Sequence, residues 1–161
     1  MKKVYLIRHA KSDWKKSVDD FERPLNKRGK KDAEFMANRL KNFGVKPDII
    51  YSSPAKRAKS TAKIIAKVLE YPKSSIVYVD KLYEATIEDY ISTIKSVPES
   101  FDEVFIIGHN PVITEVGELL SDTILTSMPT CSIVCLEFET EKFSQIEQGR
   151  VVFFDYPKKH R

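Results

Sequence analysis

Short apolar runs alternate with amphipathic helical patterns along the chain, and this alternation constrains the fold more than any other feature. Six runs have the length and composition of strands: Val4–Arg8, Asp48–Ser52, Ser75–Val79, Glu103–Gly108, Ser132–Phe138 and Arg150–Asp155. Strands that alternate with helices indicate an α/β domain with a largely parallel sheet. The first and fourth runs are continuously apolar, as expected of central strands covered on both faces.

We therefore predict a single three-layer domain with a mostly parallel sheet of about six strands and helices on both faces. The length of 161 residues is near the commonest size of one domain, and we expect residues 1–161 to form it. Four helices are predicted from apolar stripes that begin near Ala33, Ala55, Ile87 and Val112. Their expected start signals are Ser53 with Pro54, Thr86 with Asp89, and Asn110 with Pro111.

The charge is unevenly distributed along the chain. The net charge is +4, but residues 1–80 hold 20 basic and 9 acidic residues, whereas residues 81–161 hold 7 and 14. A basic first half fits an anion-binding site, a nucleic-acid footprint or merely solvated helix faces. No nucleic-acid motif accompanies it, so we expect no nucleic-acid partner.

Other function classes are disfavoured by what the sequence contains. Cys131 and Cys135 have no second pair and no nearby histidine, so we predict core thiols and neither a metal site nor a disulfide. The longest apolar stretches, such as Val104–Ile107, are far shorter than the roughly 20 residues of a membrane span. The apolar run after Met1 is too short for a secretory signal. We expect a cytoplasmic protein without a membrane partner or a cofactor.

Basic and imidazole side chains follow the predicted strand ends. Arg8 and His9 follow the first strand, His109 follows the fourth, and Arg57 lies shortly after the second. One such residue alone is more often a cap or a surface residue. Ligands of parallel sheets bind beyond the carboxyl ends of the strands, where helix N-termini also favour anions. Two histidines and two arginines at one sheet edge therefore predict a phosphate site, held by side chains because no glycine-rich phosphate loop is present.

Four motifs then resemble one family. In chain order they are Arg8-His9-Ala10, Arg23-Pro24-Leu25-Asn26-x-x-Gly29, Ser53-Pro54-x-x-Arg57-Ala58-x-x-Thr61-Ala62 and Gly108-His109-Asn110-Pro111. Together they resemble the histidine phosphatase superfamily, which is also called phosphoglycerate mutase-like. The Arg-His-Ala-Lys-Ser-Asp-Trp start and Met128-Pro129-Thr130 are most similar to its SixA-type phosphohistidine phosphatase branch.

The resemblance implies a metal-independent phosphatase that works through a phosphohistidine intermediate and releases phosphate. His9 would be the nucleophile, with its other ring nitrogen donating to a backbone carbonyl. Arg8, Arg57 and Arg23 would bind the phosphoryl oxygens, with His109 as a further, protonated donor. The backbone N–H of Asn110 would contribute from a helix terminus.

Glu84 is the candidate general acid, because many family members place a carboxylate between the third strand and the next helix. The alternative is an exposed glutamate near a helix start. If the substrate is phosphohistidine, an imidazole leaves readily and acid help matters less.

Two positions depart from the superfamily pattern. Ala10 replaces the usual glycine, which is harmless where the backbone is extended but strained at positive φ. Asn26 replaces the usual threonine, and we expect it to serve equally well as an N-cap.

The short segment between Glu84 and His109 leaves no room for a lid, and an open pocket favours a phosphorylated protein, such as a histidine-containing phosphotransfer domain. Small phosphate esters are the alternative substrates, for a phosphomonoesterase or a phosphoglycerate mutase-like enzyme. A phosphate-binding module without turnover is a further alternative.

Two long irregular segments, Ala10–Leu25 and Ser121–Thr130, are expected to be functional loops. In the first, Lys11, Trp14 and Lys15 form a basic, aromatic stretch beside the predicted pocket. Trp14 either contacts a substrate or packs into the core.

Overall fold

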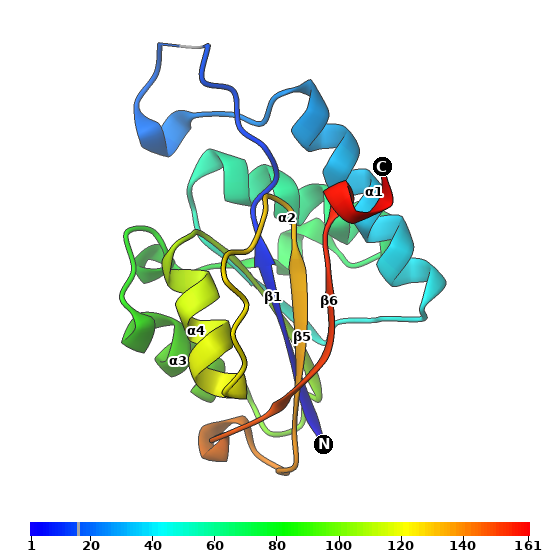
Figure 1. The fold of residues 1–161 in the computed structure, drawn as a ribbon, viewed down its shortest axis with the longest axis vertical. Helices are drawn as coiled ribbons and strands as arrows, with labels where there is room; N and C mark the ends of the chain where they lie inside the picture. Colours follow the sequence, from blue (N-terminus) through cyan, green and yellow to red (C-terminus); the bar gives the residue numbers. More distant parts are fainter. Residues whose placement is uncertain (16) are drawn as a thin grey trace.

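A six-stranded sheet forms the centre of the computed structural model, which describes residues 1–15 and 17–161 (Figure 1). The strand order is β3-β2-β4-β1-β5-β6. The strands are β1 (Lys2–Arg8), β2 (Ile49–Ser52), β3 (Val77–Tyr78), β4 (Glu103–Gly108), β5 (Ile133–Phe138) and β6 (Arg150–Asp155). The first four strands in this order are parallel, whereas β5 runs antiparallel to both of its neighbours.

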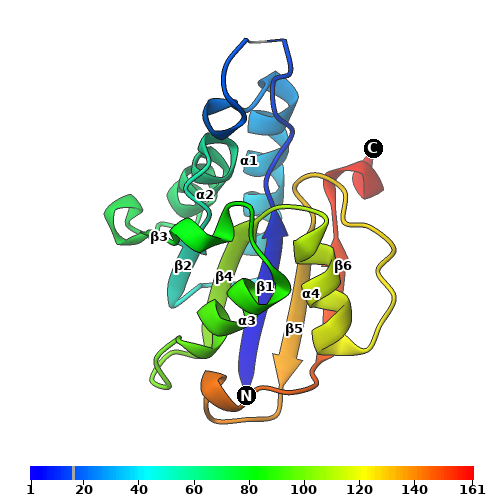
Figure 2. The same ribbon diagram turned by 90° about the vertical axis from the view of Figure 1, so that its left-hand side faces the viewer.

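Two pairs of α-helices cover the sheet, one pair on each face (Figure 2). The helices are α1 (Lys27–Asn42), α2 (Lys56–Val68), α3 (Ile87–Lys95) and α4 (Val112–Ser121). Short 3-10 helices are η1 (Asp20–Glu22), η2 (Lys73–Ser75), η3 (Asp80–Leu82), η4 (Phe143–Gln145) and η5 (Pro157–His160).

Each face of the sheet has its own apolar core because alternate strand residues point to opposite sides. Tyr5 and Ile7 pack with Met36 and Ile65 of α1 and α2, whereas Leu6 belongs to the cluster on the α3 and α4 side. The predicted three-layer α/β fold is therefore confirmed. The third strand is shorter than expected, since only Val77 and Tyr78 pair with β2.

The helix start signals were only partly predicted. Asn26 accepts a hydrogen bond from the Gly29 backbone N–H at 2.7 Å, and Thr86 with Asp89 forms the expected capping box. The start at Ser53 and Pro54 is wrong, because α2 begins at Lys56 after Ala55. The Ser53 hydroxyl accepts from the Ala55 N–H and remains outside the helix.

The sheet register sets the positions of the two strand-end histidines. Arg8 pairs with Gly108 across β1 and β4, so His9 and His109 both lie one residue beyond the paired ends. The His9 N–H donates to the Gly108 carbonyl at 3.1 Å, which continues the ladder past the strands. The carboxyl edge of the sheet thus brings together residues that are 100 positions apart.

No helix in the described part of the chain is both long and apolar enough to span a bilayer. Cys131 and Cys135 are buried free thiols, as predicted.

Candidate active site

The two strand-end histidines face each other at the carboxyl edge of the sheet. Their ring centroids are 5.1 Å apart. His9 is 7% exposed, and Arg23 and Arg57 are similarly buried beside it. Arg8, His9, Arg23, Arg57, His109 and Asn110 all line one pocket, so the structure brings together six of the seven predicted site residues.

The His9 ring is held in one tautomer. Its Nδ1 lies 2.7 Å from the Ala10 backbone carbonyl, which can only accept a hydrogen bond. Nδ1 therefore carries the proton, as predicted, and Nε2 keeps its lone pair. Burial, with repulsion from His109, Arg57 and Arg8, lowers the pKa of His9 to about 3. The ring is therefore neutral at physiological pH.

Ala10 fits its position without backbone strain. The described residues other than glycine that have positive φ are Glu70, Glu84, Asp122, Thr126 and Cys131, and Ala10 is not among them. The Ala10 N–H donates to the Thr61 hydroxyl at 3.0 Å, and this hydroxyl donates to the Arg57 carbonyl. Thr61 thus joins the loop after His9 to the first turn of α2.

The N-terminal end of α1 packs directly on the loop that follows His9. The Asn26 N–H donates to the Lys11 carbonyl, and a Cβ on Gly29 would overlap the Lys11 backbone. A glycine is needed here for close approach. This contact fixes the start of the Ala10–Leu25 segment against the carboxyl edge of the sheet.

Asp20 is a site residue that the sequence analysis missed. Its carboxylate accepts from Arg23 Nη1 at 2.8 Å, Arg57 Nη2 at 3.1 Å and the Tyr83 hydroxyl at 2.7 Å. Its backbone carbonyl accepts from Arg57 Nη1 at 2.7 Å. The Tyr83 hydrogen bond, with the charges of Arg57 and Arg23, lowers the pKa of Asp20. One carboxylate therefore orients two of the three predicted phosphate-binding arginines.

His109 is fixed from two sides. Its backbone N–H donates to the Tyr90 hydroxyl at 2.9 Å, and its Nε2 lies 2.8 Å from the Ser53 hydroxyl. A Cβ at Gly108 would overlap the Tyr90 ring and hydroxyl, so this position requires glycine. The Ser53 hydroxyl therefore helps to orient the His109 ring. The sequence analysis predicted Ser53 as a helix cap and did not predict this contact.

The surroundings of His109 in the pocket act on its protonation. Burial, followed by repulsion from Arg57, lowers the pKa of His109 to about 4, so the ring is neutral near pH 7. A bound dianion would favour the charged ring, so the expected positive charge of His109 toward a phosphoryl group stays a prediction.

Three buried donor-capable nitrogens at the site have no hydrogen-bond partner among the residues that the structure describes. They are Arg8 Nε, Arg57 Nε and His109 Nδ1. Buried polar nitrogens are normally satisfied, and leaving one unpaired costs about 1–3 kcal/mol. A cluster of such groups beside His9 is suited to an anionic ligand with several acceptor oxygens.

Asn110 does not cap α4. Pro111 occupies the N-cap position, and the Asn110 side chain instead accepts from Thr114 and donates to the Met128 carbonyl at 2.8 Å. The same carbonyl accepts from Arg8 Nη1 at 2.9 Å. Because Pro129 and Thr130 line the pocket, the predicted Ser121–Thr130 loop does reach the site.

Glu84 lies outside the pocket lining. Its side chain is exposed, and its backbone has φ of 55°, a left-handed conformation that is uncommon for glutamate. The preceding residue approaches the site in its place: the Tyr83 ring is 5.8 Å from that of His109 and its hydroxyl bonds Asp20. The prediction that Glu84 is the general acid is not tested by this geometry.

The pocket extends well beyond the two histidines. Its volume is about 490 Å³, and its outer part is lined by Lys11, Trp14, Asp32, Pro157, Lys158 and Arg161. Trp14 is 75% exposed, so of its two predicted positions the core is excluded. Its ring stacks on the Arg23 guanidinium, whose central carbon is 3.5 Å from the ring centroid.

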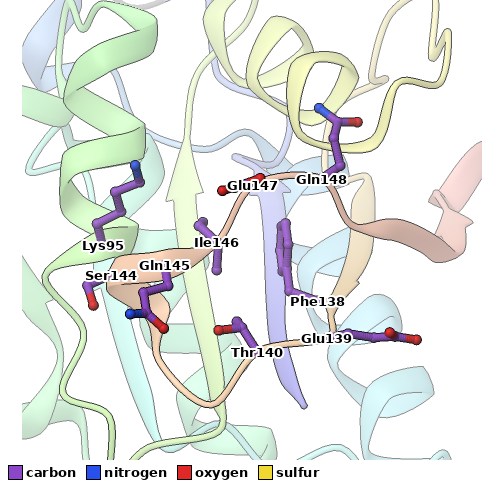
Figure 3. A pocket seen from close by; sticks show the side chains of 9 residues that line it. All are labelled: Lys95, Phe138, Glu139, Thr140, Ser144, Gln145, Ile146, Glu147 and Gln148. Carbon is purple, nitrogen blue, oxygen red and sulfur yellow. The ribbon is translucent and has the colours of Figure 1, made fainter.

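A second hollow of about 610 Å³ lies at the opposite end of the sheet, where β5 ends and β6 begins (Figure 3). Its lining residues are Lys95, Phe138, Glu139, Thr140, Ser144, Gln145, Ile146, Glu147 and Gln148. They include one cation and no histidine, so the hollow lacks the groups that distinguish the first pocket. No group of three or more potential metal ligands occurs among residues 1–15 and 17–161.

Comparison with known proteins defines the family. The model of the histidine phosphatase superfamily (branch 1) matches residues 4–105, and the chain belongs to this superfamily. An uncharacterized chloroplastic protein from Arabidopsis thaliana is 29% identical over 145 residues, which are 84% of this chain and 66% of that protein. The chain thus spans slightly less than two thirds of that relative's length.

Solved structures confirm the phosphoglycerate mutase-like fold over almost the whole chain. The protein histidine phosphatase SixA complexed with tungstate has a TM-score of 0.88 at 21% identity and covers 99% of both chains. A protein from Agrobacterium tumefaciens, assigned as the phosphohistidine phosphatase SixA, has a TM-score of 0.83 at 29% identity, with 97% of this chain and 98% of that chain covered. The predicted similarity to the SixA branch is therefore confirmed.

Proposed function

We propose that residues 1–161 form a single histidine phosphatase domain that hydrolyses phosphoryl groups without a metal ion, through a phosphohistidine on His9. The proposed substrate is a phosphorylated protein carrying phosphohistidine, as for a SixA-like enzyme. The products are the dephosphorylated protein and phosphate.

The state of the His9 ring carries this proposal. A neutral imidazole whose Nδ1 proton is bound to the Ala10 carbonyl has its lone pair on Nε2. This nitrogen can attack phosphorus without first losing a proton, so no general base is needed for the first step. Thr61 supports the geometry, because it holds the Ala10 amide at 3.0 Å.

In the first step, Nε2 of His9 forms a bond to phosphorus while the bond from phosphorus to the leaving nitrogen or oxygen breaks. The leaving group keeps the electron pair: an imidazole that is protonated on its other nitrogen leaves as the neutral ring, whereas an alkoxide takes a proton from water or from a general acid. In the second step, water attacks the phosphohistidine, the phosphorus–Nε2 bond breaks, and phosphate and neutral His9 are released. Charge is spread over three phosphoryl oxygens throughout, so catalysis depends mainly on positioning and electrostatic stabilisation.

The unpartnered nitrogens support the roles of the other residues. Arg8, Arg57 and His109 all line the pocket, and each has one buried nitrogen that lacks a hydrogen-bond partner among the described residues. Ser53 can donate to Nε2 of His109, which places the proton of the neutral ring on Nδ1. Arg23 adds a third guanidinium at the pocket wall. The guanidinium groups supply the positive charge that a metal ion provides in other phosphatases.

The proposed preference for phosphohistidine follows from the question of which carboxylate could protonate the leaving group. Asp32 is the carboxylate that lines the pocket, and it is paired with Arg161 at 2.9 Å. A substrate whose leaving group needs little protonation suits such a pocket, and imidazole is a better leaving group than an alkoxide. The similarity to SixA proteins, one of them complexed with the oxyanion tungstate, supports the same substrate class.

The state of the two cysteines supports a proposed cytoplasmic location. The buried free thiols of Cys131 and Cys135 fit a reducing, cytoplasmic environment.

A substrate panel tests the proposed function. The probes are a histidine-containing phosphotransfer domain phosphorylated with phosphoramidate, 4-nitrophenyl phosphate and 3-phosphoglycerate. The phosphorylated domain should give the highest kcat/KM, and His9→Ala should lower turnover of every hydrolysed probe by at least a thousandfold. Equal turnover by wild type and His9→Ala would refute the mechanism. Faster hydrolysis of a small ester would refute the substrate class.

A further inference from the structure

The outer part of the pocket is larger and more basic than phosphoryl chemistry requires. A water molecule occupies about 30 Å³ in the liquid, and a phosphoryl group is only a few times larger, so most of the 490 Å³ lies outside the phosphate site. Among the described residues, the lining holds six cationic side chains and one carboxylate: Arg8, Lys11, Arg23, Arg57, Lys158 and Arg161 against Asp32.

Three of these cations, Arg8, Lys11 and Lys158, have no carboxylate partner among the described residues, and Arg8 belongs to the phosphate site. Arg23 and Arg57 share Asp20, and Arg161 pairs with Asp32. None of the ion pairs of the described residues includes Lys11 or Lys158, and both side chains are exposed. Their charges are therefore free to act on a ligand that reaches the pocket from solvent.

Trp14 adds an apolar surface next to these lysines. It is 75% exposed although tryptophan is large and mostly apolar. The Trp14 ring is held in place because the Arg23 guanidinium stacks on it. Arg23 is itself hydrogen-bonded to Ser12 and Asp20. An exposed aromatic ring kept in place by its neighbours is typical of protein-binding surfaces.

The backbone segment that carries Lys158 is also held in place. It lies on η5, whose His160 bonds Asp155 and whose Pro157 is buried, and the segment packs beside α1 (Figure 1). The two lysines come from opposite ends of the sequence but line the same pocket as Trp14.

We propose that Lys11, Trp14 and Lys158, here called the basic rim, bind acidic side chains that flank the phosphorylated residue of the substrate protein. The inference rests on the proposed function, since the substrate enters the same pocket. The two lysines attract carboxylates next to the phosphoryl-bearing residue, and the Trp14 ring packs against the apolar part of the same segment. The occupant is thus an acidic polypeptide segment.

The test uses two synthetic peptides of equal length, each with one phosphohistidine. In one peptide the flanking residues are glutamates, and in the other they are alanines. Wild type should hydrolyse the acidic peptide with the higher kcat/KM, and added NaCl should reduce the difference by screening. Exposed ion pairs are weak, so we expect about a two- to fivefold preference for each lysine that contributes.

Lys158→Glu is the diagnostic variant, and Lys159→Glu is its matched control. The two positions are adjacent and exposed, and the charge change is the same, but only Lys158 lines the pocket. Lys158→Glu should remove most of the acidic preference, whereas Lys159→Glu should keep it. The readout is the ratio of kcat/KM for the acidic peptide to that for the alanine peptide within each variant, so a general loss of activity affects both peptides alike and does not change it.

These outcomes separate the two proposals. Equal rates for both peptides, or equal effects of the two variants, would overturn the basic rim while leaving the phosphatase proposal intact. If wild type hydrolyses no probe, the phosphatase proposal fails. Binding can still be measured in that case, because Trp14 is the only tryptophan. The acidic peptide without its phosphoryl group should change the Trp14 emission more than the alanine peptide does, and no difference would overturn the rim.

Discussion

Burying two neutral histidines in a pocket of arginines should make the stability of the folded protein sensitive to acid. The pKa is lowered to about 3 for His9 and about 4 for His109, whereas both should titrate near 6.5 in the unfolded chain. Between these values the unfolded state binds protons that the folded state does not. Stability is therefore fully present above about pH 6.5 and is lost as the pH falls toward 4.

The size of the effect follows from the same values. At pH 5 the unfolded histidines are 1.5 pH units below their pKa, and each unit corresponds to about 1.4 kcal/mol. Each histidine then contributes a loss of about 2 kcal/mol between pH 7 and pH 5, or about 4 kcal/mol together. This is a large fraction of the roughly 5–15 kcal/mol that stabilises a typical domain.

Urea unfolding of wild type and of the His9→Asn/His109→Asn double variant at pH 7 and pH 5 measures this loss. Other groups, such as the carboxylates, titrate in both proteins, so the difference between the two pH dependences isolates the histidines. Wild type should lose about 4 kcal/mol more than the double variant, and each single variant should show about half of the effect. Equal losses in wild type and double variant would refute the reasoning that both rings are held neutral by burial and neighbouring charge.

Three further predictions concern Asp20, Glu84 and whether turnover needs a metal ion. Asp20→Asn should lower kcat/KM by about three- to tenfold, mainly through KM, because Arg23 and Arg57 lose their shared charged partner. The expected factor is modest because the Asp20 side chain is half exposed. A rise in kcat/KM would instead mean that the carboxylate competes with substrate. Glu84→Gln should slow hydrolysis of 3-phosphoglycerate, whose leaving group is an alkoxide, more than that of phosphohistidine if Glu84 is the general acid, and equal rates with wild type on both substrates would remove it from the mechanism. Turnover should persist in EDTA, and a loss that added metal restores would contradict the metal-independent mechanism.

Much of the fold and the centre of the site could be predicted from sequence because both depend on strand ends. Continuous apolar runs marked β1 and β4 as central strands, and in a parallel sheet neighbouring carboxyl ends meet. This placed His9 and His109 together, with Arg8 next to them, as the register of Arg8 with Gly108 confirms. The Asn26 cap and the Thr86 capping box are local signals, and both were read correctly.

What could not be predicted depends on contacts between loops that are distant in sequence. Asp20 joins Arg23, Arg57 and Tyr83 only in the folded chain, and nothing in its local sequence marks it. The sequence predicts Asn110 as a helix cap, but its side chain instead hydrogen-bonds with the Met128 carbonyl and the Thr114 hydroxyl. The lowered pKa of His109 could not be predicted either, because desolvation and the nearby arginines are properties of the assembled pocket.

Trapping the covalent intermediate tests the central claim most directly. Wild-type protein is mixed with the phosphorylated phosphotransfer domain, quenched in alkali within the first turnover, digested and analysed by mass spectrometry. Phosphohistidine is stable in base and labile in acid, so the phosphate should be found on the peptide that contains His9, lost after acid treatment and missing from His9→Ala. Substrate turnover with no phosphate on His9, or phosphate on another residue of a fully active protein, would contradict the account.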